Sequence, residues 1–152
     1  MHRVVKGLKW AELSSDPWER QVLRGLPAKG KAYERKVLRA LVEKYPLIPN
    51  PWFEFQDENG GGMASPDGVI ALQDATIVVE VKLSWTFEAH QQLSQLYFPL
   101  LEKFTQNPTK GIVICKNLRP QVPKGLLVDS FYSGIFSPFP ITIVQWLERG
   151  PI

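Results

Sequence analysis

The chain has 152 residues, of which 44% are hydrophobic, so it is long enough and apolar enough to form one domain with its own core. Its single cysteine, Cys115, excludes an internal disulfide and a four-cysteine zinc or iron–sulfur site, and indicates a reducing compartment. The sequence has no signal-peptide pattern and no membrane-length apolar run, so we expect a cytoplasmic protein with no membrane partner. The net charge is +3, and the first 39 residues hold ten lysine or arginine residues against four acidic ones, which predicts a basic surface in that part of the chain.

The N-terminal half predicts helices followed by strands. Residues 17–24 predict a short helix, and residues 30–46 a firm one whose stripe at the 3.6-residue period comprises Glu34, Val37, Leu38, Leu41, Val42 and Tyr45. Residues 52–58 alternate like a strand, and the glycines at 60–62 predict a flexible loop. Residues 67–72 and 76–82 predict two further strands, which complete an antiparallel meander with the first.

The C-terminal half predicts a helix, two strands and an irregular segment. The helix runs from about Thr86 to Phe104 with a kink at Pro99, and residues 110–116 form a short buried strand. A proline-rich passage over 117–140 leads to a last strand at 141–146. This order predicts one α/β domain over residues 1–152, with a mixed central sheet flanked by helices. It divides into an N-terminal extension (1–29), a motif-bearing core (30–116) and a C-terminal segment (117–152).

Three charged residues lie in the two strand-like runs, 67–72 and 76–82, of an otherwise apolar hairpin, namely Asp67, Glu80 and Lys82. Strand alternation places Glu80 and Lys82 side by side on one face. A two-residue turn at 73–74 or 74–75 makes the numbers of paired residues add to 147 or 149, so that Asp67 faces Glu80 or Lys82 with Cβ atoms about 5 Å apart. A three-residue turn would move Asp67 to the other face unless a bulge restored it.

Glu34 is a fourth charged residue, and it heads the apolar stripe of the helix at 30–46, so we expect it to face the sheet. Two or three carboxylates with a lysine favour Mg²⁺ or Mn²⁺, because hard cations take oxygen ligands. Taken singly, Glu-x-Lys on a strand is usually a solvated face and Asp-Gly is usually a turn. Their occurrence together, at matching register, favours a functional site.

These residues resemble the PD-(D/E)xK nuclease superfamily. Pro66-Asp67 followed by Glu80-Val81-Lys82 is similar to its signature, and the preceding helix with Glu34 is similar to its first motif. The order helix, three strands, helix, strand is similar to its restriction-endonuclease-like αβββαβ core. The resemblance covers residues 30–116 and the last strand.

The resemblance implies metal-dependent hydrolysis of phosphodiester bonds. Mg²⁺ or Mn²⁺ would be held by Asp67, Glu80 and the Val81 carbonyl, with Glu34 completing the site directly or through water. Lys82 would orient the attacking water and stabilise developing charge, and these roles agree with metal-ion chemistry in general.

The helix after the motif resembles that of RecB-like exonucleases, where a glutamine and a tyrosine one turn later follow the lysine. No glutamine lies four residues before Tyr97, which departs from that pattern. Gln91 and Gln95 share a helix face that either contacts DNA or the site, or is simply solvated. The single cysteine excludes the iron–sulfur exonucleases of that branch.

Several other residues are candidates for nucleic-acid contacts. Lys31, Arg35 and Arg39 lie four apart on the first long helix and predict phosphate contacts. The alternative interpretation is a basic helix face that is simply solvated. Trp85 is a candidate for stacking on unpaired bases, although an aromatic at such a junction is more often part of the core. No phosphate-binding glycine motif follows a strand, so we expect no nucleotide cofactor.

The sequence therefore predicts a small Mg²⁺- or Mn²⁺-dependent DNase. Without a separate recognition domain, we expect structure- or end-directed cutting, with a homodimer or a partner protein as one means of positioning DNA. Small members of the resembled family include junction resolvases, structure-specific endonucleases and recombination-linked exonucleases. The alternatives are a catalytically silent nucleic-acid-binding or assembly module with the nuclease fold, and an RNA-cleaving nuclease.

Overall fold

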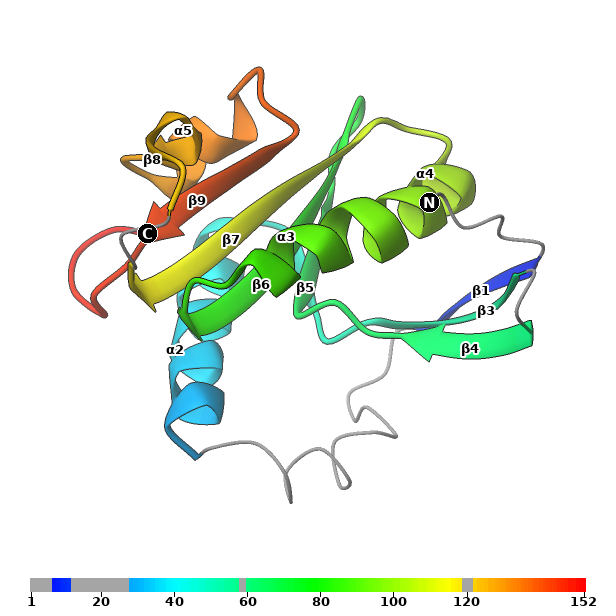
Figure 1. The fold of residues 1–152 in the computed structure, drawn as a ribbon, viewed down its shortest axis with the longest axis horizontal. Helices are drawn as coiled ribbons and strands as arrows, with labels where there is room; N and C mark the ends of the chain where they lie inside the picture. The colour runs from blue at the N-terminus through cyan, green and yellow to red at the C-terminus, as the bar shows by residue number, and fades with distance from the viewer. Residues whose placement is uncertain (1–6, 12–27, 58–59, 119–121) are drawn as a thin grey trace.

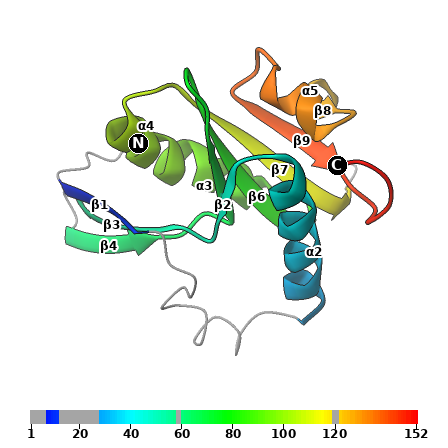
Figure 2. The same ribbon diagram turned by 180° about the vertical axis from the view of Figure 1, so that it is seen from behind.

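A central six-stranded mixed sheet with helices on both faces organises the molecule, as the sequence predicts (Figures 1 and 2). The computed structural model describes residues 7–11, 28–57, 60–118 and 122–152, so the predicted helix at 17–24 lies outside the described residues. In spatial order the strands are β2 (Leu47–Pro49), β5 (Gly68–Ala71), β6 (Thr76–Ser84), β7 (Thr109–Asn117), β9 (Ile141–Gln145) and β8 (Leu127–Val128).

The two halves of this sheet pair differently. β2, β5 and β6 are antiparallel neighbours, whereas β7 is parallel to β6, and β9 is parallel to both β7 and β8. A parallel pair such as β6 and β7 needs a long crossover connection, and the helical segment between them supplies it. The mixed sheet that the sequence predicts is present, and β5 and β6 form the antiparallel pair of the predicted meander.

Two hydrophobic cores lie on opposite faces of the sheet. α2 (Ala28–Lys44) and α5 (Phe131–Ile135) cover one face, and the segment made of α3 (Phe87–Gln92), η1 (Leu93–Tyr97) and α4 (Phe98–Thr105) covers the other. In β6, Ile77, Val79 and Val81 belong to the first core, and Val78 belongs to the second. Strand alternation therefore directs Glu80 and Lys82 to the face of Val78, as expected.

α2 forms because its apolar residues recur at helical spacing, and it ends just before Pro46, which cannot continue a helix. Val37 and Leu41 are fully buried against the sheet. The stripe differs from the predicted one at two positions. Tyr33 is buried and its hydroxyl donates to the carbonyl of Trp146 at 2.8 Å, whereas Val42 is 48% exposed. Val42 is turned by about 100° from Leu41, which carries it beyond the edge of the core.

The β5–β6 hairpin has the register that places Asp67 opposite Glu80. Gly68 pairs with Val79, and Ala71 with Thr76, so the numbers of paired residues add to 147. The N–H of Leu72 donates to the carbonyl of Ala75 at 2.8 Å, which leaves a two-residue turn. One of the two predicted registers is thereby selected.

The first strand of the meander differs from the predicted one. The strand expected at 52–58 is β3 (Trp52–Asp57), but it pairs with β1 (Gly7–Ala11) and β4 (Gly60–Ala64) in a separate antiparallel sheet. β2, a three-residue strand, takes its place beside β5. Alternation predicted the strand correctly, but it carries no information about the sheet in which the strand pairs.

The glycine run at 60–62 is a strand rather than the flexible loop that its composition predicts. It forms β4, which is paired along its length with β3. A Cβ atom at Gly62 would lie 2.8 Å from a ring carbon of Phe55 across the pair, so this glycine permits the close approach of the aromatic ring.

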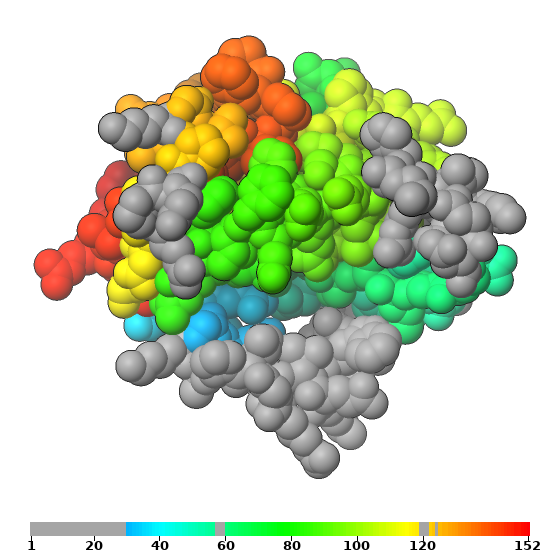
Figure 3. Space-filling view, in the orientation of Figure 1, coloured from blue at the N-terminus to red at the C-terminus, as the bar shows by residue number. Residues whose placement is uncertain are grey.

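The crossover helix is interrupted before Pro99. η1 is a π-helical turn between α3 and α4, and Pro99 lies at the start of α4. Proline lacks the N–H that an α-helix needs, and a π turn is one way in which a helix absorbs this defect. The predicted disturbance at Pro99 is therefore real. In the space-filling view this helical segment, in green, forms the surface between the C-terminal elements and the β3–β4 hairpin (Figure 3).

The C-terminal part is more ordered than the expected irregular segment. Between β7 and β9 it holds the 3₁₀ turn η2 (Lys124–Leu126), β8 and α5, and the Ser130 hydroxyl caps α5 by accepting from the N–H of Ser133. The expected last strand is present as β9. Among the residues that the structure describes, no helix has both the length and the apolar character needed to cross a bilayer.

Candidate active site

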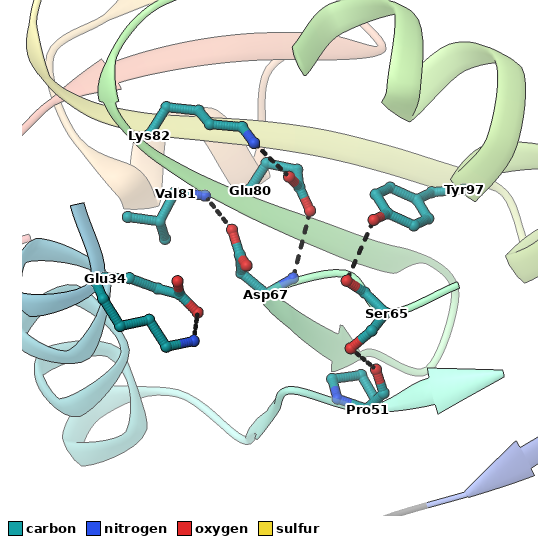
Figure 4. Close-up of polar contacts among 9 residues, drawn as sticks. Glu34, Pro51, Ser65, Asp67, Glu80, Val81, Lys82 and Tyr97 are labelled. Carbon is teal, nitrogen blue, oxygen red and sulfur yellow. Dashed lines mark hydrogen bonds and ion pairs between the residues drawn. The ribbon is translucent and has the colours of Figure 1, made fainter. Parts of the chain in front are cut away.

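Asp67 and Glu80 hold each other in place where β5 leaves β6. The backbone N–H of Asp67 donates to Oε1 of Glu80 at 3.3 Å, and the N–H of Val81 donates to Oδ2 of Asp67 at 2.7 Å (Figure 4). The β5–β6 ladder begins at Gly68, so Asp67 lies just beyond the end of the ladder. There the Asp67 carboxylate, rather than a backbone carbonyl, accepts the N–H of Val81. This exchange fixes both side chains.

Lys82 lies beside Glu80, as strand alternation predicts. Its Nζ is 3.8 Å from Oε2 of Glu80, and the Lys82 side chain is 38% exposed whereas the Glu80 side chain is 3% exposed. The ammonium group therefore forms an ion pair with a buried carboxylate while it remains open to solvent. This arrangement leaves the lysine free to meet an anionic ligand at the surface.

Glu34 approaches from α2, on the other side of Asp67. It is 9% exposed, as expected from its place in the stripe, and its Oε1 lies 3.5 Å from Nζ of Lys31. Figure 4 shows its side chain extending from the helix towards Asp67. Both carboxylates belong to one hollow of about 260 Å³, here called the site hollow, which is lined by Gly30, Lys31, Glu34, Asp67, Val81, Lys82 and Leu83. The hollow thus gathers three of the four predicted catalytic residues, and the fourth, Glu80, contacts two of them from the hairpin.

The site contains more carboxylates than positively charged groups that contact them. Burial, followed by the nearby carboxylates of Glu80 and Glu34, raises the pKa of Asp67 well above its usual value, although the N–H of Val81 and the Lys82 ammonium oppose the shift. Burial likewise raises the pKa of Glu80 to about 7, against the effect of Lys82. Carboxylates that resist ionisation in this way are suited to a bound cation, which would favour their charged forms.

The donor set fits Mg²⁺ or Mn²⁺ in chemistry. It consists of carboxylate oxygens next to a solvent-accessible hollow, which is the ligand type that these hard cations prefer. Within the described part of the chain, no three carboxylate, histidine or cysteine side chains are grouped closely enough to form a ready cation site. Asp67 and Glu80 accept backbone N–H bonds instead.

Gln92 and Tyr97 form a pair that the sequence reading missed. Nε2 of Gln92 donates to the Tyr97 hydroxyl at 3.1 Å, and that hydroxyl donates to the carbonyl of Ser65 at 3.2 Å, two residues before Asp67 (Figure 4). The spacing of five would separate these residues on an α-helix, but the π turn adds about one residue per turn and brings them together. Pro99 was the available signal, because it predicts a disturbance of the helix at this point.

The residues predicted to contact nucleic acid differ in their surroundings. Arg35 and Arg39 are exposed on α2, and Gln91 and Gln95 are exposed on the crossover helix. Lys31 does not share the open face of the arginines: its side chain is 16% exposed and pairs with Glu34. Trp85 is 6% exposed within the core under the crossover helix, so its ring is not available to stack on a base, and the prediction for it is corrected.

Comparisons with known proteins give no match from which a function could be argued. The chain matches no family model, no curated protein and no solved structure. The geometry of the hairpin, the site hollow and the crossover helix is therefore what supports or opposes each function.

Proposed function

We propose that this protein is a Mg²⁺- or Mn²⁺-dependent nuclease that hydrolyses DNA phosphodiester bonds at ends or structured sites. One observation carries the proposal: Asp67, Glu80 and Lys82 are held at the divergence of β5 and β6, with Glu34 facing Asp67 across the site hollow. Carboxylates with raised pKa values next to an accessible lysine support this proposal, because perturbed pKa values cluster at functional sites.

The order of elements supports the proposed membership of the PD-(D/E)xK superfamily. α2, β2, β5, β6, the crossover helix and β7 follow one another as in the αβββαβ core that the sequence resembles, with the β3–β4 hairpin inserted after the first strand. Asp67 immediately precedes the second strand of this series, and Glu80 and Lys82 lie on the third. The Gln92–Tyr97 pair lies on the helix that follows, where the RecB-like resemblance expects a glutamine and a tyrosine.

In the proposed mechanism the protein's own residues prepare the phosphate for attack. Asp67 and Glu80 would hold the cation, with the Val81 carbonyl and Glu34 as further oxygen donors. A cation held there would supply a lowered pKa for bound water and would offset phosphate charge. Lys82 would hold the attacking water and stabilise the negative charge that develops on the phosphate, since its ammonium already lies at the accessible edge of Glu80. The Tyr97 hydroxyl fixes the Ser65 carbonyl and thereby positions the segment that carries Asp67.

The experiment that tests the proposal is cleavage of a labelled substrate panel with Mg²⁺, Mn²⁺ or EDTA. The panel contains single-stranded DNA, duplex, flap, four-way junction and RNA. We expect metal-dependent cutting of DNA that is lost in Asp67→Asn and retained in Asp74→Asn, a matched change in the exposed hairpin turn. Cutting in EDTA would contradict the metal mechanism, and preferential cutting of RNA would redirect the substrate assignment.

A catalytically silent binding module is the second candidate. The observation in its favour is that Asp67 and Glu80 already satisfy backbone N–H groups, which makes them structural as they stand. This candidate predicts that Asp67→Asn lowers stability and leaves nucleic-acid binding unchanged, with no cleavage by the wild type under any metal. The two candidates therefore differ in a single assay of the wild-type protein.

A further inference from the structure

A second charged cluster links α2 to the segment after β9, and the proposed catalytic site does not use it. Nζ of Lys36 on α2 and Nζ of Lys116 near the end of β7 lie 3.6 Å and 3.8 Å from the same Oε2 atom of Glu148. Two ammonium groups thus share one carboxylate, which leaves one positive charge in excess. Their side chains are 59% and 41% exposed, so both reach solvent.

Glu148, which contacts both lysines, has an unusual backbone conformation. Its φ angle is 65°, in the left-handed region that residues with side chains rarely adopt. Such conformations persist where the surrounding structure determines them, and they concentrate at functional sites. Here the residue with this conformation is Glu148, whose carboxylate contacts the ammonium groups of both lysines.

Two further hollows join this cluster to the site hollow. The second hollow has a volume of about 470 Å³ and is lined by Lys36, Leu83, Lys116 and Glu148, among others. The third has a volume of about 370 Å³, and Lys36, Arg39, Trp146 and Glu148 are among its lining residues. Leu83 is common to the site hollow and the second, and Lys36 and Glu148 are common to the second and third. The three hollows therefore adjoin, and we call them together the α2 groove.

Trp146, which is partly buried against the core under α2, lines the far end of the α2 groove as an aromatic wall. Its ring packs on the buried Tyr33 at a centroid distance of 6.3 Å, and its Nε1 donates to the carbonyl of Gly150 at 3.4 Å. An aromatic ring held in place next to cations is the combination by which proteins bind unpaired nucleotides, with bases on the ring and phosphates on the cations. A duplex would gain little from the ring because its bases are already stacked on one another.

We propose that the α2 groove binds single-stranded nucleic acid, with phosphates at Lys116 and Lys36 and a base on Trp146. Glu148 holds the phosphate position in the free protein and is displaced from it by the strand. The proposal rests on the proposed function, because the strand in the groove continues from the phosphate at Lys82. It names the substrate class as a strand that is unpaired next to the cut.

Salt dependence of binding tests the phosphate contacts. Affinity for a labelled 12-nucleotide thymidine strand is measured by fluorescence anisotropy in EDTA across a salt series. Lys36→Gln and Lys116→Gln are each expected to lower the slope of log affinity against log salt by about 0.7, the value for one single-strand phosphate contact. The matched control is Lys44→Gln, in the last turn of α2 and outside all three hollows. Slopes equal to that of the control would overturn the proposal.

A comparison of ligands tests the aromatic wall. Trp146→Leu is expected to weaken binding of the thymidine strand by about tenfold, as for loss of one stacked base, and to leave binding of an abasic strand of equal length unchanged. Trp146→Phe keeps a ring and is expected to bind within about threefold of the wild type. Thermal unfolding of each variant shows whether the fold survives. Equal loss on the abasic strand, or a wild type that binds a hairpin duplex as well as the thymidine strand, would overturn the single-strand assignment.

Glu148→Gln tests the displaced carboxylate. Removing a charge that competes with phosphate for Lys36 and Lys116 is expected to strengthen binding of both the thymidine and the abasic strand several-fold, and weaker binding would overturn the role of Glu148. Because all these measurements are made without metal, they separate the two proposals. If the wild type never cleaves but shows these binding effects, the proposed nuclease function is wrong and the proposed groove stands. If it cleaves without showing them, the nuclease function stands and the proposed groove is wrong.

Discussion

The candidate active site and the Lys36–Glu148–Lys116 cluster contain the same kinds of group in opposite proportions. In the site, the carboxylates of Glu34 and Glu80 are buried, and together with the half-buried Asp67 they outnumber the lysines that contact them. In the cluster, two exposed lysines share one carboxylate. A buried excess of negative charge calls for a cation, whereas an exposed excess of positive charge calls for a polyanion. Burial and stoichiometry, rather than the presence of an ion pair, distinguish the proposed roles.

The largest expected effect is on cleavage. Asp67→Asn and Glu80→Gln are each expected to reduce the rate of phosphodiester cleavage by at least about 100-fold, because each removes a charge that the transition state depends on. The matched change of an exposed carboxylate in the hairpin turn, Asp74→Asn, is expected to leave the single-turnover cleavage rate at saturating enzyme within about threefold of the wild type. The measurement is single-turnover cleavage of the best substrate of the panel. Similar losses at both places would remove the distinction between buried and exposed carboxylates.

Stability against pH should separate buried from exposed carboxylates. The pKa of Glu80 is raised in the folded state to about 7, so between its unfolded value and that pKa the folded protein binds more protons than the unfolded chain. The stabilisation that the protonated group permits is present at low pH and is lost as pH rises through about 7. We therefore expect the Tm of the metal-free protein to fall from pH 5 to pH 8.

Two additions sharpen this pH experiment. Glu80→Gln should flatten the fall in Tm, because an amide cannot ionise in the buried position. Mg²⁺ or Mn²⁺ should raise the Tm of the wild type most at pH 8, where the cation meets charged carboxylates. A Tm that does not vary with pH in the wild type, or varies equally in Glu80→Gln, would contradict the assigned cause.

Substitution of Tyr97, whose hydroxyl supports the segment that carries Asp67, is expected to have an intermediate effect. Tyr97→Phe removes the hydroxyl that donates to the Ser65 carbonyl and accepts from Gln92, so we expect cleavage to fall by about tenfold and the free energy of unfolding to fall by about 1 kcal/mol. Tyr132→Phe is the matched control, since Tyr132 is 61% exposed on α5. Cleavage kinetics and urea unfolding of the two variants measure the two effects. A loss of stability without any loss of rate would make Tyr97 a purely structural residue.

The smallest expected effect is on the stability of the exposed cluster. Glu148→Gln and Lys36→Gln should each change the free energy of unfolding by less than about 1 kcal/mol, because exposed ion pairs are screened by water and salt. Urea unfolding at low and high salt is the measurement. A cost of several kcal/mol that persists in high salt would show that the cluster is a structural clamp between α2 and the segment after β9.

Local pattern was enough to predict most elements and to limit the hairpin register to two choices. The apolar period defined α2, alternation defined β6, and the short turn limited the pairing of Asp67 to two choices, of which the structure has the one opposite Glu80. Pattern failed where the information was not local. Residues 52–57 alternate as a strand should, yet they pair in the second sheet, and the glycines at 60–62 are a strand because β3 is available beside them.

The sequence by itself determined the composition of the candidate site, because Asp67, Glu80 and Lys82 lie within one hairpin whose geometry follows from alternation and turn length. Only the tertiary structure decided what surrounds it. It buried Trp85, joined Gln92 to Tyr97 through a π turn, and brought Lys36, Lys116 and Glu148 together from three distant segments. The physical reason is that short-range periodicity fixes the face on which a side chain lies, whereas contacts between segments depend on how the sheet pairs and how the helices cross it.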